Sequence, residues 1–406
     1  MNILLSAFAC DPYSGSDEEV GWQWAKQLAL YGYKLTVLTR ASHKEAIERR
    51  IEETGECKHV RFVYLDLPNL HAFLHKFNRR NHIYYYFWQW LAFRHALMLH
   101  NQIPFDRVHH VTWVSFRQPS FMGYLGIPFY FGPVAGGDEI PEGYTRAFSL
   151  KQKLLEKVRK IANSFVKYDP LMHVTFANAE KLFFTSEQHL TRIPKVYLAK
   201  SQISLAIGSD SSSCKNQALT KKGNTQKVRL LFVGRCIGWK GMDLGLEIFA
   251  LAHKKNSQLS LTIIGDGIER SRWENKAHKL GISEAIEWLG WLEKDEVNQS
   301  FSEYDVFFYP SLRDSGGFVV LEALQAGLPV VCFKLGGPGV VVNDTCGATI
   351  EALPDIDKTI ENYVEKLLHV VERSRTDVQL SSACRVRATD FSWRVLIERI
   401  YETTFQ

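Results

Sequence analysis

Short apolar segments alternate with amphipathic helical segments in two separate series along this chain of 406 residues. The first series opens with an expected strand at 3–9, a helix at 20–31 and a strand at 34–39. The second opens with a strand at 228–234, a helix at 242–254 and a strand at 259–265. Strands that alternate with helices build parallel sheets with helices on both faces. The sequence therefore predicts an α/β protein with two doubly wound, Rossmann-like domains.

A polar segment at 209–227 separates the two series. It is rich in Ser, Lys and Asn and has almost no large apolar residue, which is typical of a linker or a surface excursion. We therefore expect one domain at 1–205 and a second at 206–385. The last residues, 386–406, have apolar side chains at helical spacing, and we expect this helix to pack back on the first domain.

The composition is that of an ordinary folded protein, and it excludes several classes. Hydrophobic residues make up 46% and charged residues 23% of the chain, which excludes disorder and fibrous repeats. The net charge of +5 is too small to indicate a nucleic-acid binder. The seven cysteines are isolated and form no CxxC, which favours a reducing cytoplasm. We find neither a basic leader nor an apolar stretch of about 18 residues, so we expect no signal peptide and no membrane span.

The most specific segment, 305–337, joins an expected buried strand to a glycine-containing turn and a helix. The turn holds Asp314, Gly316 and Gly317, and the helix begins near Phe318 with Glu322 in its first turns. Glycine lets backbone amides approach a ligand closely, and a helix N-terminus attracts anions, so this turn is suited to phosphate. The pattern leaves one alternative open, in which Asp314 only caps the helix and Glu322 is exposed.

This segment resembles the retaining glycosyltransferases of family four, in which two acidic residues flank such a turn; here Asp314 stands where the first Glu is usual. A second segment, FVGRCIGWKGMDLGL at 232–246, is similar to the family's strand-to-helix segment and carries Arg235 and Lys240. Supporting similarities lie at 13–22, at 263–267, at 287–292 and in FSWRVLIERIY near the end. The resemblance implies the GT-B fold, in which two facing Rossmann-like domains bind donor and acceptor in the cleft between them.

The resemblance also assigns roles to residues of the second domain. Arg235 and Lys240 would neutralise the donor diphosphate, because fixed cations stabilise a departing phosphate. Glu322 would bind the nucleotide ribose and Asp314 the sugar hydroxyls. The other donor-binding residues that it implies are Gly15, Gly234, Gly316, Gly317 and Phe318. Taken alone, the two cations equally fit a solvated surface loop.

In the first domain the resemblance points to one loop and one strand. Ser16, Asp17 and Glu18 would contact the acceptor, although acids at a helix N-terminus are common without any ligand. A histidine near the donor sugar is expected in 105–119, where His109 and His110 are adjacent. Neighbouring strand residues face opposite sides, so at most one of the two lines the cleft. We favour His110, with a core histidine as the alternative.

We expect neither a metal nor another cofactor. Asp355 and Asp357 have the Asp-x-Asp spacing of metal-dependent transferases, but they follow Pro354 at the start of a helix, where we expect them to act as caps. The resemblance implies a retaining reaction by front-face attack, in which the departing phosphate takes the acceptor proton. No protein nucleophile is therefore assigned.

Two segments of the first half combine apolar and basic residues. Basic residues occur among Tyr, Trp and Phe in 73–100, namely Lys76, Arg79, Arg80 and Arg94. Such a mixture suits the boundary of lipid headgroups. Segment 146–167 has seven Lys or Arg and one Glu, with apolar residues at helical spacing from Leu150 to Ile161. We interpret it as a basic amphipathic helix that lies on an anionic membrane; the alternative is a helix packed in the core.

These observations predict a retaining, metal-independent hexosyltransferase that uses a UDP- or GDP-linked sugar as donor. The acceptor would be a glycan or a lipid-linked oligosaccharide in bacterial surface polysaccharide or lipopolysaccharide synthesis. We expect the protein in the cytoplasm, peripheral on the inner face of the membrane. The main alternative is a catalytically degenerate, binding-only subunit, because Asp replaces Glu at 314. A nicotinamide-dependent oxidoreductase is disfavoured, since no G-x-G-x-x-G follows the first strand of either series.

Overall fold

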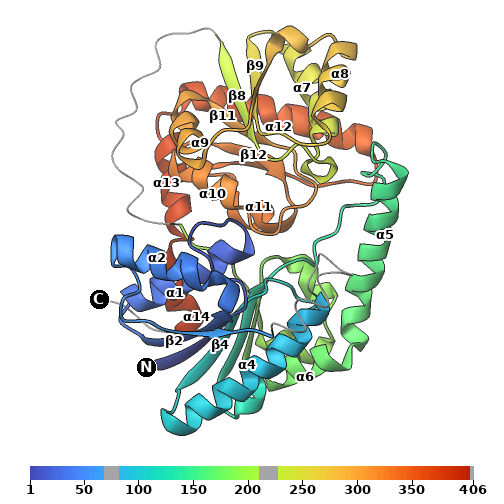
Figure 1. Cartoon of the computed structure of the whole chain (residues 1–406). Helices are drawn as coiled ribbons and strands as arrows, with labels where there is room; N and C mark the ends of the chain where they lie inside the picture. The colour runs from blue at the N-terminus through green and yellow to red at the C-terminus, as the bar shows by residue number, and fades with distance from the viewer. Residues whose placement is uncertain (68–81, 210–226, 403–406) are drawn as a thin grey trace. The chain divides into compact units, whose positions relative to one another are not determined.

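The computed structural model describes residues 1–67, 82–209 and 227–402 (Figure 1). Contacts between Cα atoms divide the chain into two compact units. The first unit comprises residues 1–137 and 160–207, and the second comprises residues 138–159 and 208–406. Each unit is built on one parallel sheet with flanking helices, which confirms the predicted fold class.

Residues 138–159 are counted with the second unit, whereas the sequence placed them in the first domain. The reason is local packing: the Tyr144 hydroxyl donates to the carbonyl of Leu353 over 2.8 Å. Phe148 lies so close to Gly238 that a Cβ at that glycine would come within 3.2 Å of the ring. Most of the predicted link at 209–227 lies outside the described residues. The packing of 386–406 on the first domain stays a prediction.

The first unit contains a seven-stranded sheet in the order β3-β2-β1-β4-β5-β6-β7, and every pair in it is parallel. Its strands are β1 (Asn2–Ala7), β2 (Lys34–Arg40), β3 (Arg61–Leu65), β4 (Arg107–Thr112), β5 (Phe129–Val134), β6 (Lys181–Phe184) and β7 (Ser201–Ile203). Its helices include α1 (Asp17–Leu30), α2 (Lys44–Thr54), α4 (His82–Gln102) and α6 (Pro170–Asn178). Helix α5 (Leu150–Phe165), green in Figure 1, runs across the division at residue 159.

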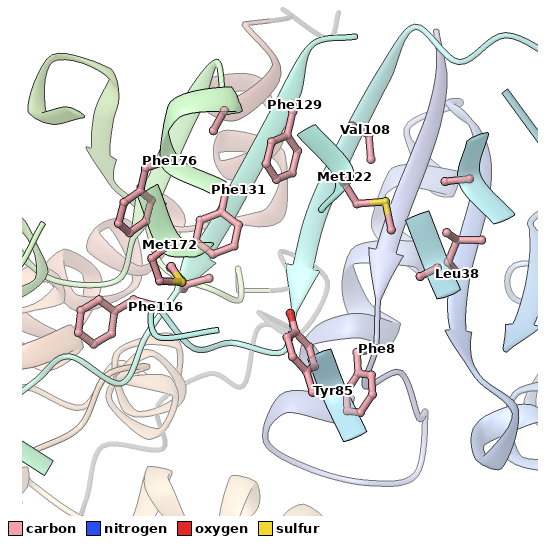
Figure 2. Close-up of a cluster of buried hydrophobic side chains, with 14 of the residues drawn as sticks. Phe8, Leu38, Tyr85, Val108, Phe116, Met122, Phe129, Phe131, Met172 and Phe176 are labelled. Atoms are coloured by element: carbon pink, nitrogen blue, oxygen red, sulfur yellow. The ribbon is translucent and has the colours of Figure 1, made fainter. Parts of the chain in front are cut away.

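The core of the first unit is rich in aromatic side chains. Phe129 and Phe131 lie two positions apart on β5, so they face the same side of the sheet, and both are fully buried. They lie in one cluster with Met122 and Phe176 (Figure 2). Phe8, at the end of β1, meets Tyr85 of α4 edge to face at 5.1 Å between ring centroids. A large packed core of this kind fixes the strand ends from which the loops of the unit emerge.

The second unit contains a six-stranded sheet in the order β10-β9-β8-β11-β12-β13, again with every pair parallel. Its strands are β8 (Val228–Val233), β9 (Leu259–Ile264), β10 (Ile286–Gly290), β11 (Val306–Tyr309), β12 (Val330–Phe333) and β13 (Gly347–Ile350). Its helices are α7 (Met242–Lys255), α8 (Arg270–Lys279), α9 (Lys294–Ser300), α10 (Phe318–Gln325), α11 (Gly336–Val341), α12 (Ile356–Thr376), α13 (Leu380–Thr389) and α14 (Trp393–Tyr401) among the described residues.

Each sheet has one place where the strand order reverses. In the first unit it lies between β1 and β4, and in the second between β8 and β11. The loops that leave such neighbouring strands diverge to opposite sides, so a crevice opens at their carboxyl ends and ligands bind there. The loops after β8 and β11 carry the residues that the sequence singled out for the donor.

Candidate functional site

A charged cluster joins the loop after β8 to the loop after β11 in the second unit. Lys240 ends a short 3₁₀ turn at 238–240, and its Nζ lies 2.9 Å from Oδ2 of Asp314. The Tyr309 hydroxyl, at the end of β11, accepts from Lys240 and donates to the same Asp314 oxygen. The Lys240 and Asp314 side chains are each only 16% exposed, so their charges interact with little screening by solvent.

Asp314 divides its two oxygens between the turn and the cation. Oδ1 accepts hydrogen bonds from the amides of Gly316 at 3.1 Å and Gly317 at 3.0 Å. Oδ2 accepts from the Lys240 ammonium group and the Tyr309 hydroxyl. Burial alone would raise the pKa of this carboxyl, but Lys240, the Tyr309 hydroxyl and the Gly317 amide lower it to about 2. The helix-capping alternative is therefore wrong: Asp314 bonds to the turn, the N-cap of α10 is Gly317 with no side-chain cap, and Glu322 is half-buried. The role of Asp314 toward a sugar stays a prediction, as do those of the two glycine amides.

Glycines allow the loops at this edge to pack backbone against backbone. Gly241 has a φ of +71°, and a Cβ there would lie 1.9 Å from the carbonyl oxygen of Pro310. Gly317 has a φ of +65°, and its Cβ would meet the backbone of Gly337 at 3.0 Å. Larger residues at these positions would separate the loops that hold Lys240 and Asp314.

The other donor residues predicted in the second unit lie around this cluster. Gly234 and Arg235 follow β8 directly, and the Arg235 side chain is exposed. Phe318 is the first residue of α10, and Glu322 is half-buried one turn further along the helix. The structure therefore collects Gly234, Arg235, Lys240, Asp314, Gly316, Gly317, Phe318 and Glu322 on the loops and the helix that follow two adjacent strands.

Sequence reasoning missed several partners of the cluster. Tyr309 belongs to an apolar strand, and only its place at the strand end could have marked it. Arg313 pairs with Glu156 of α5 and lies 4.8 Å from the Trp239 ring centroid. Ser315 donates to Asp138 in the same unit. Segment 138–159 thus braces the turn next to Asp314, which no local pattern in the sequence could reveal.

The predicted acceptor residues lie between β1 and α1 in the first unit. Ser16 has a φ of +64° and precedes Asp17 and Glu18 in the first turn of α1. Burial and the neighbouring Glu18 raise the pKa of Asp17 to about 7, against the Val114 amide and the Trp113 side chain, which lower it. Gly15, which was predicted to bind the donor, lies in the same loop and has open space around it, since a Cβ there would meet nothing within 4 Å. Contact of Ser16, Asp17 and Glu18 with an acceptor, and of Gly15 with the donor, stays a prediction.

Both adjacent histidines on β4 are fully buried in the first unit. His109 Nε2 lies 2.5 Å from the Gly132 carbonyl, and His110 stacks on Phe131 at 5.2 Å between ring centroids. Burial lowers the pKa of each to about 3, so both imidazoles are neutral at ordinary pH. For His110 this is the environment of a core histidine, the alternative that the sequence left open.

Asp355 is an N-cap, as predicted: its side chain accepts from the amide of Lys358 over 3.1 Å, and Asp357 lies in the first turn of α12. The described residues contain no group of three or more His, Cys, Asp or Glu side chains arranged to hold a metal ion. No helix in the described part of the chain is long and apolar enough to cross a membrane. Of the residues of 73–100 noted for charge, only Arg94 is described; Lys76, Arg79 and Arg80 are not.

Residues 216–382 match the family described as glycosyl transferases group 1. This range contains the entire Lys240–Tyr309–Asp314 cluster. The chain is 30% identical over 179 residues to the sulfoquinovosyl transferase SQD2 of Arabidopsis thaliana, which is 44% of this chain and 33% of that protein. Matches to the first curated relatives span between 33% and 67% of their own length.

Solved structures resemble the chain over nearly its whole length. One is the lipopolysaccharide outer core galactosyltransferase WaaB, with a TM-score of 0.62, 14% identity and 99% of each chain covered. Another is HepE of Anabaena in complex with UDP, with a TM-score of 0.61, 15% identity and 99% of each chain covered. At this identity the likeness shows the fold, which is that of the GT-B transferases with two Rossmann-like domains.

Proposed function

We propose, from the match of residues 216–382 to the group 1 glycosyl transferases, that this chain transfers a hexosyl unit from a nucleoside-diphosphate sugar. The observation that carries the proposal is the Lys240–Tyr309–Asp314 cluster at the carboxyl ends of β8 and β11. It places a partly buried cation where the sheet order reverses, which is where open α/β sheets bind nucleotides.

The transfer needs stabilisation of the negative charge that grows on the departing diphosphate. Lys240 would exchange Asp314 for a phosphate oxygen, and exposed Arg235 would add a planar, forked donor to the same group. Fixed cations in a poorly solvated site lower the barrier without reorganising during the reaction. With the charge neutralised by side chains, the reaction would need no metal. The retaining outcome follows from the family resemblance and belongs to the proposal.

We assign donor binding to the second unit and acceptor binding to the first. HepE, which shares this fold, is described in complex with UDP, and this supports a UDP-linked donor over a GDP-linked one. WaaB is described as a lipopolysaccharide outer core galactosyltransferase, which supports a glycan or lipid-linked acceptor of a bacterial surface polysaccharide. Such an acceptor would place the enzyme on the cytoplasmic face of the membrane.

The test combines nucleotide binding with turnover. A nucleotide at a hundred times its Kd stabilises the folded state by about 2.7 kcal/mol, so UDP should raise the melting temperature by several degrees, with or without EDTA. Lys240→Ala should abolish this shift, whereas Lys279→Ala, an exposed lysine in the last turn of α8, should keep it. Release of UDP from a UDP-sugar, lost in Lys240→Ala, would then show transfer or donor hydrolysis. No shift with UDP, GDP or ADP would contradict the proposal.

A second candidate, a binding-only subunit, is favoured by one observation. Asp314 is shorter than the Glu usual in the family, and its Oδ1 is already occupied by the amides of Gly316 and Gly317. A protein of this kind would show the UDP-induced shift without UDP release from any UDP-sugar. If the shorter side chain is what removed the activity, Asp314→Glu should restore UDP release.

A further inference from the structure

Helix α5 faces the protein with polar side chains and faces solvent with apolar ones. Gln152 Nε2 donates to Glu269 over 2.8 Å, and Glu156 pairs with Arg313. Two turns further, Asn163 Nδ2 donates to the Gly137 carbonyl over 3.2 Å, and this asparagine is fully buried. Positions 152, 156, 159 and 163 lie on one side of a helix because their spacing repeats every 3.6 residues.

The opposite side of α5 is a continuous apolar stripe. Its members are between 54% and 86% exposed: Leu150, Leu154, Leu155, Val158, Ile161 and Phe165. The 16 residues of α5 extend over about 24 Å at 1.5 Å per residue. Water-facing leucines at every turn are unfavourable in a monomeric surface helix, so the stripe marks an interaction surface. The core-packed alternative for this segment is therefore wrong for its apolar face.

Charges around the stripe select its partner. Exposed cations border it and continue past its end, namely Arg146, Lys151, Lys153, Lys157, Lys160 and Lys167. The one acidic residue of the segment, Glu156, points inward to Arg313. A second copy of the chain would bring the same cations against these in an isologous contact, which like charges disfavour. Apolar side chains flanked by lysines instead suit an anionic lipid surface. There the apolar side chains insert at the boundary between headgroups and acyl chains, and the lysine ammonium groups pair with the anionic headgroups.

We propose that the α5 stripe, Leu150 to Phe165 with its flanking lysines, docks this protein on a membrane that contains anionic lipid. Helix α5 then lies in the plane of the interface with its polar face still bonded to the protein. Docking needs neither donor nor turnover, so it is independent of the transfer reaction. It would bring a lipid-linked acceptor to the enzyme, and only this consequence rests on the proposed function.

The test is flotation of the full chain with vesicles of phosphatidylcholine alone or with 30 mol% phosphatidylglycerol, a fraction of about a third that resembles anionic membranes. We expect binding to the anionic vesicles only, weakened by 0.5 M salt, which screens charges beyond about 4 Å. Leu154→Ser/Val158→Ser should weaken it at least tenfold. The matched control, Val378→Ser/Val386→Ser, replaces two exposed apolar residues elsewhere and should bind as the wild type does.

Several results would overturn the proposal. These are no binding of the wild-type chain, equal binding to both vesicles, or binding that survives Leu154→Ser/Val158→Ser. Phe87→Ser/Trp90→Ser changes two exposed residues of α4, and loss of binding in that variant alone would move the surface to α4. A lipid-free dimer that Leu154→Ser/Val158→Ser converts to monomer would show a second copy as the partner. Circular dichroism of each variant checks that the fold is retained.

Discussion

The carboxylate of Asp314 is expected to contribute measurable, pH-dependent stability to the second unit. Asp314→Asn is a suitable perturbation because an amide oxygen still accepts from the amides of Gly316 and Gly317, so the turn is kept and only the charge is lost. The pKa falls from the model-peptide value of 3.8 to about 2 in the fold, through Lys240 and Tyr309 and against the effect of burial. At about 1.4 kcal/mol per pKa unit, this difference is worth about 2 kcal/mol at neutral pH.

The sign follows from the direction of the shift. Because the pKa of Asp314 is depressed in the folded state, the stabilisation is complete above pH 4 and is lost as the pH falls toward 2. We therefore expect urea unfolding of the wild type and of Asp314→Asn to differ by about 2 kcal/mol at pH 7. The difference should shrink steadily between pH 4 and pH 2. Asp355→Asn, an exposed cap of α12, is the control and should cost about 1 kcal/mol or less.

Two results would refute this reasoning. A difference at pH 7 below about 0.5 kcal/mol would mean that the attraction between Lys240 and Asp314 only offsets the free-energy cost of desolvating them, as in many ion pairs. A large difference that stays constant from pH 7 down to pH 2 would mean that the substitution disturbs the turn rather than the charge. Hydrogen exchange of the amides of Gly316 and Gly317 separates these cases, because faster exchange would report loss of the turn.

Other substitutions test the geometry elsewhere. In thermal melts, Gly241→Ala should lower the free energy of unfolding by roughly 2 kcal/mol or more, because its Cβ would lie 1.9 Å from a backbone oxygen. The control Gly281→Ala has a similar φ of +70° but open space around it, and should cost only about 1 kcal/mol. Tyr309→Phe should cost about 1 kcal/mol in urea unfolding while keeping the UDP-induced shift, since Lys240 remains. Burial holds the pKa of the His110 imidazole at about 3, so between pH 6.5 and pH 3 only the unfolded chain takes up this proton and the folded state loses stability. His110→Leu should therefore make the free energy of unfolding, measured in urea, fall less steeply over this pH range.

Much of the fold was predictable because its signals are local. The spacing of apolar residues placed a strand at 34–39 and a helix at 242–254, and the structure has β2 at Lys34–Arg40 and α7 at Met242–Lys255. Two short strands, β7 and β13, were missed because their sequences, SQI and GATI, contain only one or two apolar residues each. The donor loops were found through glycine and charge at strand ends.

Contacts between distant segments were not predictable in the same way. The pairing of Arg313 with Glu156 joins positions 157 residues apart, and nothing in either local pattern records it. The orientation of α5 shows the same limit. Its periodicity indicated an amphipathic helix, but the choice of which face turns inward depends on partners such as Arg313 and Glu269. In the sequence alone, a cluster of lysines beside an apolar stripe is compatible with either the apolar or the polar face turned inward. Only the positions of those partners decide between the two.

The glycines of the predicted donor site are needed for loop packing, whereas its charges can serve stability or nucleotide binding. A double substitution distinguishes these two roles of the charges. Gly241 and Gly336 are demanded by loop packing alone, since a Cβ at Gly336 would lie 2.1 Å from the Asp314 carbonyl oxygen. The largely buried ion pair is different, because removing both charges together leaves no buried charge without its partner. Lys240→Met/Asp314→Asn should therefore recover at least half of the stability lost in Asp314→Asn, yet show no UDP-induced shift in melting temperature. Recovery with nucleotide binding intact would mean that the pair serves the fold and that the phosphate is held elsewhere.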